Sequence, residues 1–284
     1  MKARRIMIAG AAALATCGVL GMVPAAARAS SASHPAWTKR LPPVHPAGRY
    51  GGSMAYDAAT GTVVLFGGVD GPHHLNGATW TWDGTTWTKQ HPAHSPPPLA
   101  DAAMAYDAAT GTVVLFGGAD SFGNILGLTW TWDGTTWTEQ RLAASPPPLA
   151  GAAMAYDAAT GTVVLFGGEA GSGILGDTWT WNGTTTWTKQ SPAASPPARD
   201  DAAMAYDEAT STVVLFGGAG SHGFLGDTWT WNSTTWTRQH PASSPLPRHL
   251  AAMAYDAATG TAVLFGGESV HGGFFMPQST WTWG

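Results

Sequence analysis

Residues 104–118 read MAYDAATGTVVLFGG, and closely similar stretches occur at four other places in the chain. The five copies begin 49 or 50 residues apart, at Met54, Met104, Met154, Met204 and Met253. Self-similarity at a fixed period of this length is the signature of a repeat architecture, in which each copy forms one small supersecondary unit. The sequence therefore predicts an array of five similar units.

Each repeat contains four short strand-like segments separated by turn residues, as the second repeat illustrates. Residues 102–106 alternate between small and large side chains, 112–116 are mostly apolar, 129–132 alternate Thr with Trp, and 136–140 are the most polar. A strand that is apolar on both faces must be covered on both sides, so 112–116 is predicted to be central and 136–140 to lie at the solvent edge. Four-stranded sheets of this kind, repeated along the chain, predict an all-β fold with β-propeller architecture.

The spacing of glycine and tryptophan within a repeat resembles that of a known family. Gly117-Gly118 is followed about a dozen residues later by the aromatic strand around Trp130 and then by the separate Trp137, which resembles the kelch repeat. The resemblance covers residues 37–284 and implies a propeller of five four-stranded kelch-type blades. The dipeptide Trp132-Asp133 also occurs in WD repeats, but those have a shorter period and a Gly-His element that this chain lacks.

The two ends of the repeat region predict how the ring closes. Residues 280–284 complete the third strand of the fifth repeat, and no fourth strand follows. Residues 36–40, Ala-Trp-Thr-Lys-Arg, match the fourth-strand segment at 86–89. We therefore expect the N-terminal strand to complete the last blade, so that no unpaired inner edge remains.

Residues 1–29 are predicted to be a signal peptide. They have a basic start, an apolar stretch at 6–23 and a small-residue cleavage site at Ala27-Arg28-Ala29. Residues 30–284 would then form the mature propeller, secreted or held in the periplasm or cell envelope, and the alanine-rich signal is typical of bacteria. The alternatives are an uncleaved membrane anchor, lipid attachment at Cys17 and a twin-arginine signal.

The charge balance restricts the partners. Without the first 28 residues, 9 basic and 18 acidic residues leave a formal charge of −9. This disfavours nucleic acid or an anionic membrane as the partner. Cleavage would also remove the single cysteine, so disulfides, thiolate catalysis and cysteine metal sites are not expected.

Motifs that recur in every repeat are interpreted as structural. The fifteen tryptophans, three in each repeat, are expected to pack in the core. The aspartate after each repeated tyrosine is expected to cap a turn, and each glycine pair to form a turn that needs positive φ. No catalytic set, cofactor site or metal site is predicted, since the loop histidines lack metal-ligand spacing.

Candidate binding residues lie where the repeats differ, in two loops expected at the mouth of a central channel. Polar side chains concentrate in repeats four, five and one, whereas repeats two and three carry apolar ones such as Leu99, Leu149, Phe122, Ile125, Ile174 and Leu175. The candidate ligand-binding residues are Arg49, Tyr50, His73, His74, Arg199, Asp200, Asp201, His222, Arg248, His249 and His271. An alternative is that these are solvated loop residues that diverged after duplication.

A mouth with arginine on one side and apolar groups on the other predicts a small polar ligand, such as a sugar or a carboxylate, held by bidentate arginine contacts. The sequence thus favours an exported binding module for a glycan, a small polar ligand or a protein over an enzyme. The kelch resemblance also suggests a sugar-acid mutarotase-like enzyme acting at the same mouth, with Arg199, Asp200, Asp201, Arg248 and His249 as its acid, base and anchors. The copper-dependent galactose oxidases of that superfamily need a cysteine, which the mature chain lacks. A third hypothesis is a domain for assembly at the cell surface.

Overall fold

The computed structural model describes residues 40, 42–71, 74–269 and 279–284, and every regular element in these ranges is a β-strand. The predicted all-β class is confirmed. The predicted signal peptide, Cys17 and residues 36–39 of the closing strand lie outside the described residues. Within the described ranges, no helix is long and apolar enough to cross a membrane.

The chain forms successive antiparallel sheets with one repeated strand order. Sheet 1 consists of β2 (Ser53–Asp57), β3 (Thr62–Phe66), β6 (Thr79–Trp82) and β7 (Trp87–Lys89). Sheet 2 consists of β8 (Ala103–Asp107), β9 (Thr112–Phe116), β10 (Thr129–Trp132) and β11 (Trp137–Gln140). Sheet 3 consists of β12 (Ala153–Asp157), β13 (Thr162–Phe166), β16 (Thr178–Trp181) and β17 (Trp187–Lys189). Sheet 4 consists of β18 (Ala203–Asp207), β19 (Thr212–Phe216), β22 (Thr228–Trp231) and β23 (Trp236–Gln239).

Sheet 5 differs, because its described part has three strands: β24 (His249–Asp256), β25 (Thr261–Glu268) and β26 (Thr280–Trp283). Short strands in the loops were not predicted. They are β1 (Arg49–Tyr50), β4 (Val69–Asp70), β5 (His74–Leu75), β14 (Glu169–Ala170), β15 (Gly173–Ile174), β20 (Ala219–Gly220) and β21 (Gly223–Phe224). The first strand of sheet 2 runs one residue later than the predicted 102–106, since Asp107 still pairs with Thr112.

The hydrophobic pattern explains the place of each strand within its sheet. In β9, Val113, Val114 and Leu115 are fully buried, as expected for a strand covered on both faces. The outer strand β11 exposes Thr138 and Glu139. At the far end of β8 the buried Asp107 accepts a hydrogen bond from the Ala109 backbone N–H at 3.0 Å, which is the predicted turn cap.

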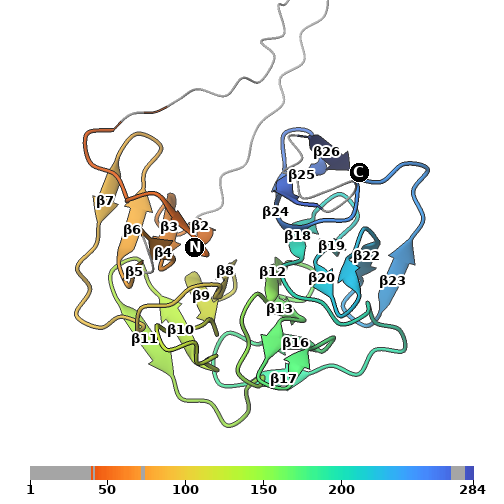
Figure 1. Ribbon diagram of the computed structural model, residues 1–284. Helices are drawn as coiled ribbons and strands as arrows, with labels where there is room; N and C mark the ends of the chain where they lie inside the picture. Colours follow the sequence, from red (N-terminus) through yellow and green to blue (C-terminus); the bar gives the residue numbers. More distant parts are fainter. Residues whose placement is uncertain (1–39, 41, 72–73, 270–278) are drawn as a thin grey trace, which may run out of the picture. The chain divides into compact units, whose positions relative to one another are not determined.

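Successive sheets pack against each other through their first strands, with β2 on β8, β8 on β12, β12 on β18 and β18 on β24 (Figure 1). Each contact contains a cluster of buried apolar residues drawn from both sheets. This repetitive stacking of antiparallel sheets is compatible with the blades of a β-propeller.

Tryptophans on the outer strands join neighbouring sheets. The indole N–H of Trp137 donates to Thr79 Oγ1 at 2.8 Å, although the two residues lie 58 positions apart. The same bond recurs from Trp187 to Thr129 at 3.0 Å and from Trp236 to Thr178 at 2.9 Å. Each of these tryptophans also meets a phenylalanine of the preceding sheet edge to face, in the pairs Phe66–Trp137, Phe116–Trp187 and Phe166–Trp236. The tryptophan on the fourth strand of each of these sheets therefore links that sheet to the preceding one through a hydrogen bond and an aromatic contact.

We expect Trp187→Phe to lower the free energy of unfolding by about 1–3 kcal/mol, because the buried Thr129 hydroxyl loses its donor. Trp181→Phe is the matched control: Trp181 is equally buried, but its indole N–H has no hydrogen-bond partner among the described residues. Urea unfolding of both variants would measure the difference. Equal losses would show that packing, and not the hydrogen bond, joins the sheets.

The paired glycines after each central strand are required by close backbone contacts. Gly117 and Gly118 have φ of 73° and 94°. A Cβ on Gly117 would lie 2.2 Å from the carbonyl oxygen of Leu149, and Gly118 donates its N–H to that same oxygen. The expected turn with positive φ is thus confirmed, and it also anchors the loop that begins the next sheet.

Candidate functional site

All five sheets contribute to one central cavity of about 370 Å³. Each sheet supplies the same four positions, at the start of its first strand. The lining residues are 51–54, 101–104, 151–154, 201–204 and 250–253. The cavity is therefore built from equivalent backbone, and its chemistry is set by the positions that vary between the sheets.

The first of these positions forms a chain of hydrogen bonds from sheet to sheet. Gly51, Asp101, Gly151, Asp201 and Leu250 all have positive φ, between 49° and 63°. The N–H of each residue from Asp101 onward donates to the carbonyl of its counterpart in the preceding sheet, at 2.7–3.0 Å. Asp tolerates this left-handed conformation better than most residues. The backbone thus holds these five side-chain positions at one end of the cavity.

Glycine and aspartate alternate along this series for a steric reason. A Cβ added to Gly51 would lie only 2.6 Å from Asp101 Oδ1, and a Cβ added to Gly151 would lie 2.6 Å from Asp201 Oδ1. Each carboxylate therefore needs a glycine in the preceding sheet. The two aspartates consequently line the same cavity from sheets 2 and 4.

The aspartates at the cavity resist ionisation. Burial, together with the charges of Asp200 and Asp101, raises the pKa of Asp201 to about 6. Burial also raises the pKa of Asp101 and, with the charge of Glu169, that of Asp200. Among the described residues, no lysine or arginine forms an ion pair with any of these three aspartates. Within the described part of the chain, Asp101 and Asp201 thus line the cavity without a lysine or arginine counterion.

His249 lies beside this acidic group. Its Nδ1 is 3.7 Å from Asp201 Oδ2, and its Nε2 is 3.4 Å from Glu268 Oε2. The ring stacks on Phe224, with 4.2 Å between ring centroids. The structure therefore brings together Asp200, Asp201 and His249, three of the residues that the sequence singled out.

The predicted arginine anchors lie inside the sheets instead. Arg199 is fully buried and donates to Gly217 O, Pro197 O and both carboxylate oxygens of Asp227. Arg248, also buried, donates to Gly266 O, Leu246 O and Ser279 Oγ. Arg49 donates to Ala47 O and Gly67 O. These contacts hold the glycine turn and leave the arginines no evident role at the cavity.

Where leucine replaces the buried arginine of another sheet, the residue at the partner position differs as well. Sheet 4 has Arg199 with Asp227, whereas sheet 2 has Leu99 packed near Leu128 at the corresponding positions. In sheet 3 Leu149 occupies the arginine position, and the aspartate there, Asp177, pairs with Lys189 at 2.8 Å. Leu99 and Leu149 are core residues. The sequence used the residue at this position to predict a mouth with a polar and an apolar side. In the structure, Arg199, Leu99 and Leu149 are buried, so this position determines the polarity of the sheet interior and not that of the cavity.

The other candidates are dispersed. Tyr50 is exposed on β1 beside the cavity-lining Gly51, His74 is exposed and bonds Asp70, and His222 is exposed on a turn. His73 and His271 lie outside the described residues. The two loops do lie side by side, as expected: Arg49 pairs with Asp70, and Asp200 bridges Ala219.

Sequence reasoning missed Asp101 and Glu268. Asp101 was overlooked because Leu99, two residues earlier, led to the second repeat being classed as apolar. The alternation of Gly51, Asp101, Gly151 and Asp201 in otherwise similar repeats was the signal that could have revealed it.

Within the described part of the chain, no group of three or more histidine, cysteine, aspartate or glutamate residues is placed to hold a metal ion. Comparison of the sequence with known proteins gives no assignment: no protein-family model matches the chain, and no curated protein matches it.

Proposed function

We propose that this chain is an exported, kelch-type, five-bladed propeller that serves as a binding module, and that it binds a positively charged group of a glycan, small molecule or protein at the acidic end of its central cavity. The observation that carries the proposal is the pair Asp101 and Asp201, two carboxylates that line one cavity and that have no lysine or arginine partner among the described residues. Asp101 is exposed and Asp201 is half-buried, and the pKa of each is raised. A bound cation would relieve the cost of burying these charges.

The closed ring is part of this proposal. Met54 is 54% exposed, whereas its counterparts Met104, Met154 and Met204 are 9% exposed and packed on the preceding sheet. Burial of Met54 against sheet 5 would give sheet 1 the same neighbour as the other sheets. It would also allow Gly51 to continue the series of backbone hydrogen bonds with Leu250.

An amino sugar or a primary amine fits the acidic cavity better than the carboxylate ligand that the sequence suggested, because the arginines are engaged elsewhere. The exposed ring of Tyr50, next to Gly51, offers a face for stacking on a sugar. The mutarotase alternative has one supporting feature, the approach of His249 to Asp201, but it would have to work without the arginine anchors.

The test is a thermal-shift comparison of glucosamine, glucose and glucuronate. Glucosamine at about 100 times its dissociation constant should stabilise the fold by roughly 2.7 kcal/mol, and the other two sugars should not. The ligand-induced shift should vanish in the Asp101→Asn, Asp201→Asn double variant. It should persist in Asp133→Asn, a matched control because asparagine stands at the equivalent turn position 182. A shift with glucuronate that survives the double substitution would contradict the proposal.

A further inference from the structure

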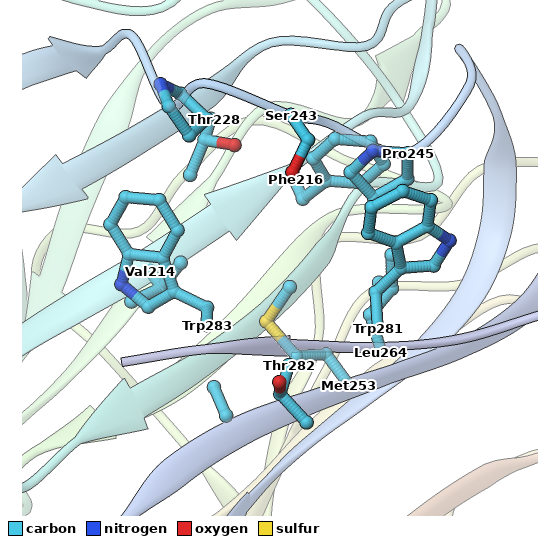
Figure 2. A pocket seen from close by; sticks show the side chains of 12 residues that line it. Val214, Phe216, Thr228, Ser243, Pro245, Met253, Leu264, Trp281, Thr282 and Trp283 are labelled. Carbon is cyan, nitrogen blue, oxygen red and sulfur yellow. The ribbon is translucent and has the colours of Figure 1, made fainter.

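A pocket between sheets 4 and 5 is lined mainly by apolar side chains, among them Phe216, Leu264 and Trp281 (Figure 2). Phe216 and Leu264 belong to the buried cluster between these two sheets. Among the described residues that line this pocket, none is charged, so it has no charge that would orient a ligand. A pocket on sheet 2 differs in this respect.

The pocket on sheet 2 has a volume of about 250 Å³ and combines indole rings with charged side chains. Its lining consists of Trp130 in β10, Trp137, Thr138 and Glu139 in β11, Arg141 just after that strand, and His94 in the connection from sheet 1. The two tryptophans are almost fully buried, whereas His94, Glu139 and Arg141 are exposed. The indoles therefore form the inner end of the pocket, and the ionisable groups surround its opening.

The register of sheet 2 places Glu139 beside the indole of Trp130. The two residues pair directly across β10 and β11, so their side chains lie on one face of the sheet. Trp137, two residues before Glu139, shares that face. The face turns toward sheet 1, because both tryptophans pack in one cluster with Val64 and Phe66.

The indole N–H of Trp130 lacks an acceptor. It is buried and has no hydrogen-bond partner within the described part of the chain. In sheet 4 the equivalent Trp229 donates to Asp227 at 2.7 Å, but Leu128 stands at that position in sheet 2 and has no oxygen to accept the bond. Unpaired buried donors are rare in folded proteins. An oxygen atom bound at the inner end of the pocket would supply the missing acceptor.

The equivalent place in sheet 3 shows which charges can gather beside this indole. Lys189 stands there at the position of Glu139, and its Nζ lies 5.9 Å from the ring centroid of Trp179, the counterpart of Trp130. The same Nζ pairs with Asp177 at 2.8 Å. Sheet 3 thus supplies both an ammonium and a carboxylate from its own side chains. Sheet 2 supplies neither of them, because leucine replaces the aspartate and glutamate replaces the lysine.

We propose that the pocket on sheet 2 binds a small zwitterion with an apolar side chain, of the class of the free α-amino acids. The ammonium group of the ligand lies against Glu139, and its carboxylate accepts from Arg141 and from the Trp130 N–H. Its side chain packs on the indole rings. Among the described residues, Glu139 and Arg141 form no ion pair, so both charges are available.

The pocket selects for both charges on one small molecule. Glu139 repels a simple anion, and Arg141 repels a simple cation. The volume is below the roughly 300 Å³ at which pockets for drug-sized ligands begin, which suits a molecule of amino-acid size. The pocket shares no lining residue with the central cavity, so this site is additional to the one proposed above.

The test is isothermal titration calorimetry of the full chain with L-leucine and two analogues. 4-Methylpentanoate is leucine without its amino group, and isopentylamine is leucine without its carboxylate. Leucine should bind at least tenfold more tightly than either analogue, because each analogue loses one charge-assisted contact. Equal affinity for leucine and an analogue, or no saturable binding of leucine, would overturn the proposal.

Substitutions taken from the other repeats provide variants that should fold. Glu139→Lys and Arg141→Ser introduce the residues that sheet 3 has at these positions. Each should weaken leucine binding at least tenfold. His240→Ser, at the position in sheet 4 that corresponds to Arg141, is the matched control and should leave binding unchanged. Unchanged leucine affinity in Glu139→Lys or in Arg141→Ser would refute the assigned contacts.

The Asp101→Asn, Asp201→Asn double variant separates this site from the central cavity. It should bind leucine as tightly as the parent does, even though its response to glucosamine is lost. Loss of leucine binding in this variant would place leucine in the cavity and overturn the site on sheet 2. The indole N–H resonance of Trp130 supplies a direct readout by NMR: it should shift when leucine is added, and a resonance that stays in place while leucine binds would contradict the proposal.

Discussion

Arg199→Leu is expected to lower the free energy of unfolding by about 3–5 kcal/mol, the largest effect of any substitution considered. The guanidinium is fully buried and bonds Asp227 at 2.8 and 3.1 Å, and its removal would leave that carboxylate half-buried without its cation. Burial raises the pKa of Asp227, but hydrogen bonds from Arg199 and Trp229 outweigh this effect and hold the pKa below its usual value. Because the ionised carboxylate is the form that Arg199 stabilises, the loss of stability should be greatest at neutral pH. Urea unfolding at pH 7 measures the loss.

The natural arrangement in sheet 2 provides the control. Arg199→Leu combined with Asp227→Leu reproduces Leu99 and Leu128, which belong to one apolar cluster without any charge. We expect the double variant to recover most of the stability, because two buried charges are replaced by apolar groups. A double variant as unstable as the single one would mean that Arg199 acts chiefly through Gly217 O and Pro197 O.

Asp201→Asn is expected to stabilise the protein by about 2–3 kcal/mol near pH 8. The pKa of Asp201 is raised to about 6, above the value of about 3.9 for an unfolded chain, so the folded state holds this proton more tightly. The parent therefore loses stability as the pH rises from about 4 to above 6, and asparagine removes that loss.

The measurement is the free energy of unfolding of both proteins from pH 3 to pH 8. The difference between them should close below pH 4, where the carboxyl is protonated in both states. Asp133→Asn should show no such gain, because hydrogen bonds from Thr135 and the backbone lower the pKa of Asp133 in spite of its partial burial. An equal stabilisation by Asp201→Asn at pH 3 and pH 8 would exclude titration as its cause.

The strands could be predicted because their signals are local. The segment 112–116 is apolar on both faces, and the turn beginning at Asp107 and the pair Gly117-Gly118 bound it on either side, so its central place follows from composition alone. The repeated tryptophans were likewise correctly assigned to packing. Sheet 5 differs from the other sheets, since its described part has three strands.

The site was harder to predict because the burial of a loop residue depends on tertiary contacts. Arg199 has the residue type of a ligand anchor, yet its side chain turns inward to the glycine turn and Asp227. Asp201 was among the predicted residues because it follows Arg199 and Asp200 in a polar loop. The charge of Asp101 raises the pKa of Asp201, and this interaction between residues 100 positions apart exists only once the sheets are side by side.

The central strands of sheets 2, 3 and 4 have the same sequence, so the sequence of these strands alone does not determine which first strand each pairs with during folding. β9, β13 and β19 share the sequence Thr-Val-Val-Leu-Phe, so in an unfolded chain each can pair with the first strand of any repeat at almost the same energy. Such degeneracy produces kinetic traps in which a repeat is skipped or two repeats exchange strands. Some features differ from one sheet to the next, namely the Arg199–Asp227 pair, Leu99 and Leu128 in one apolar cluster, and the glycine that precedes each cavity aspartate by one sheet. These differences would favour pairing with the correct neighbour during folding.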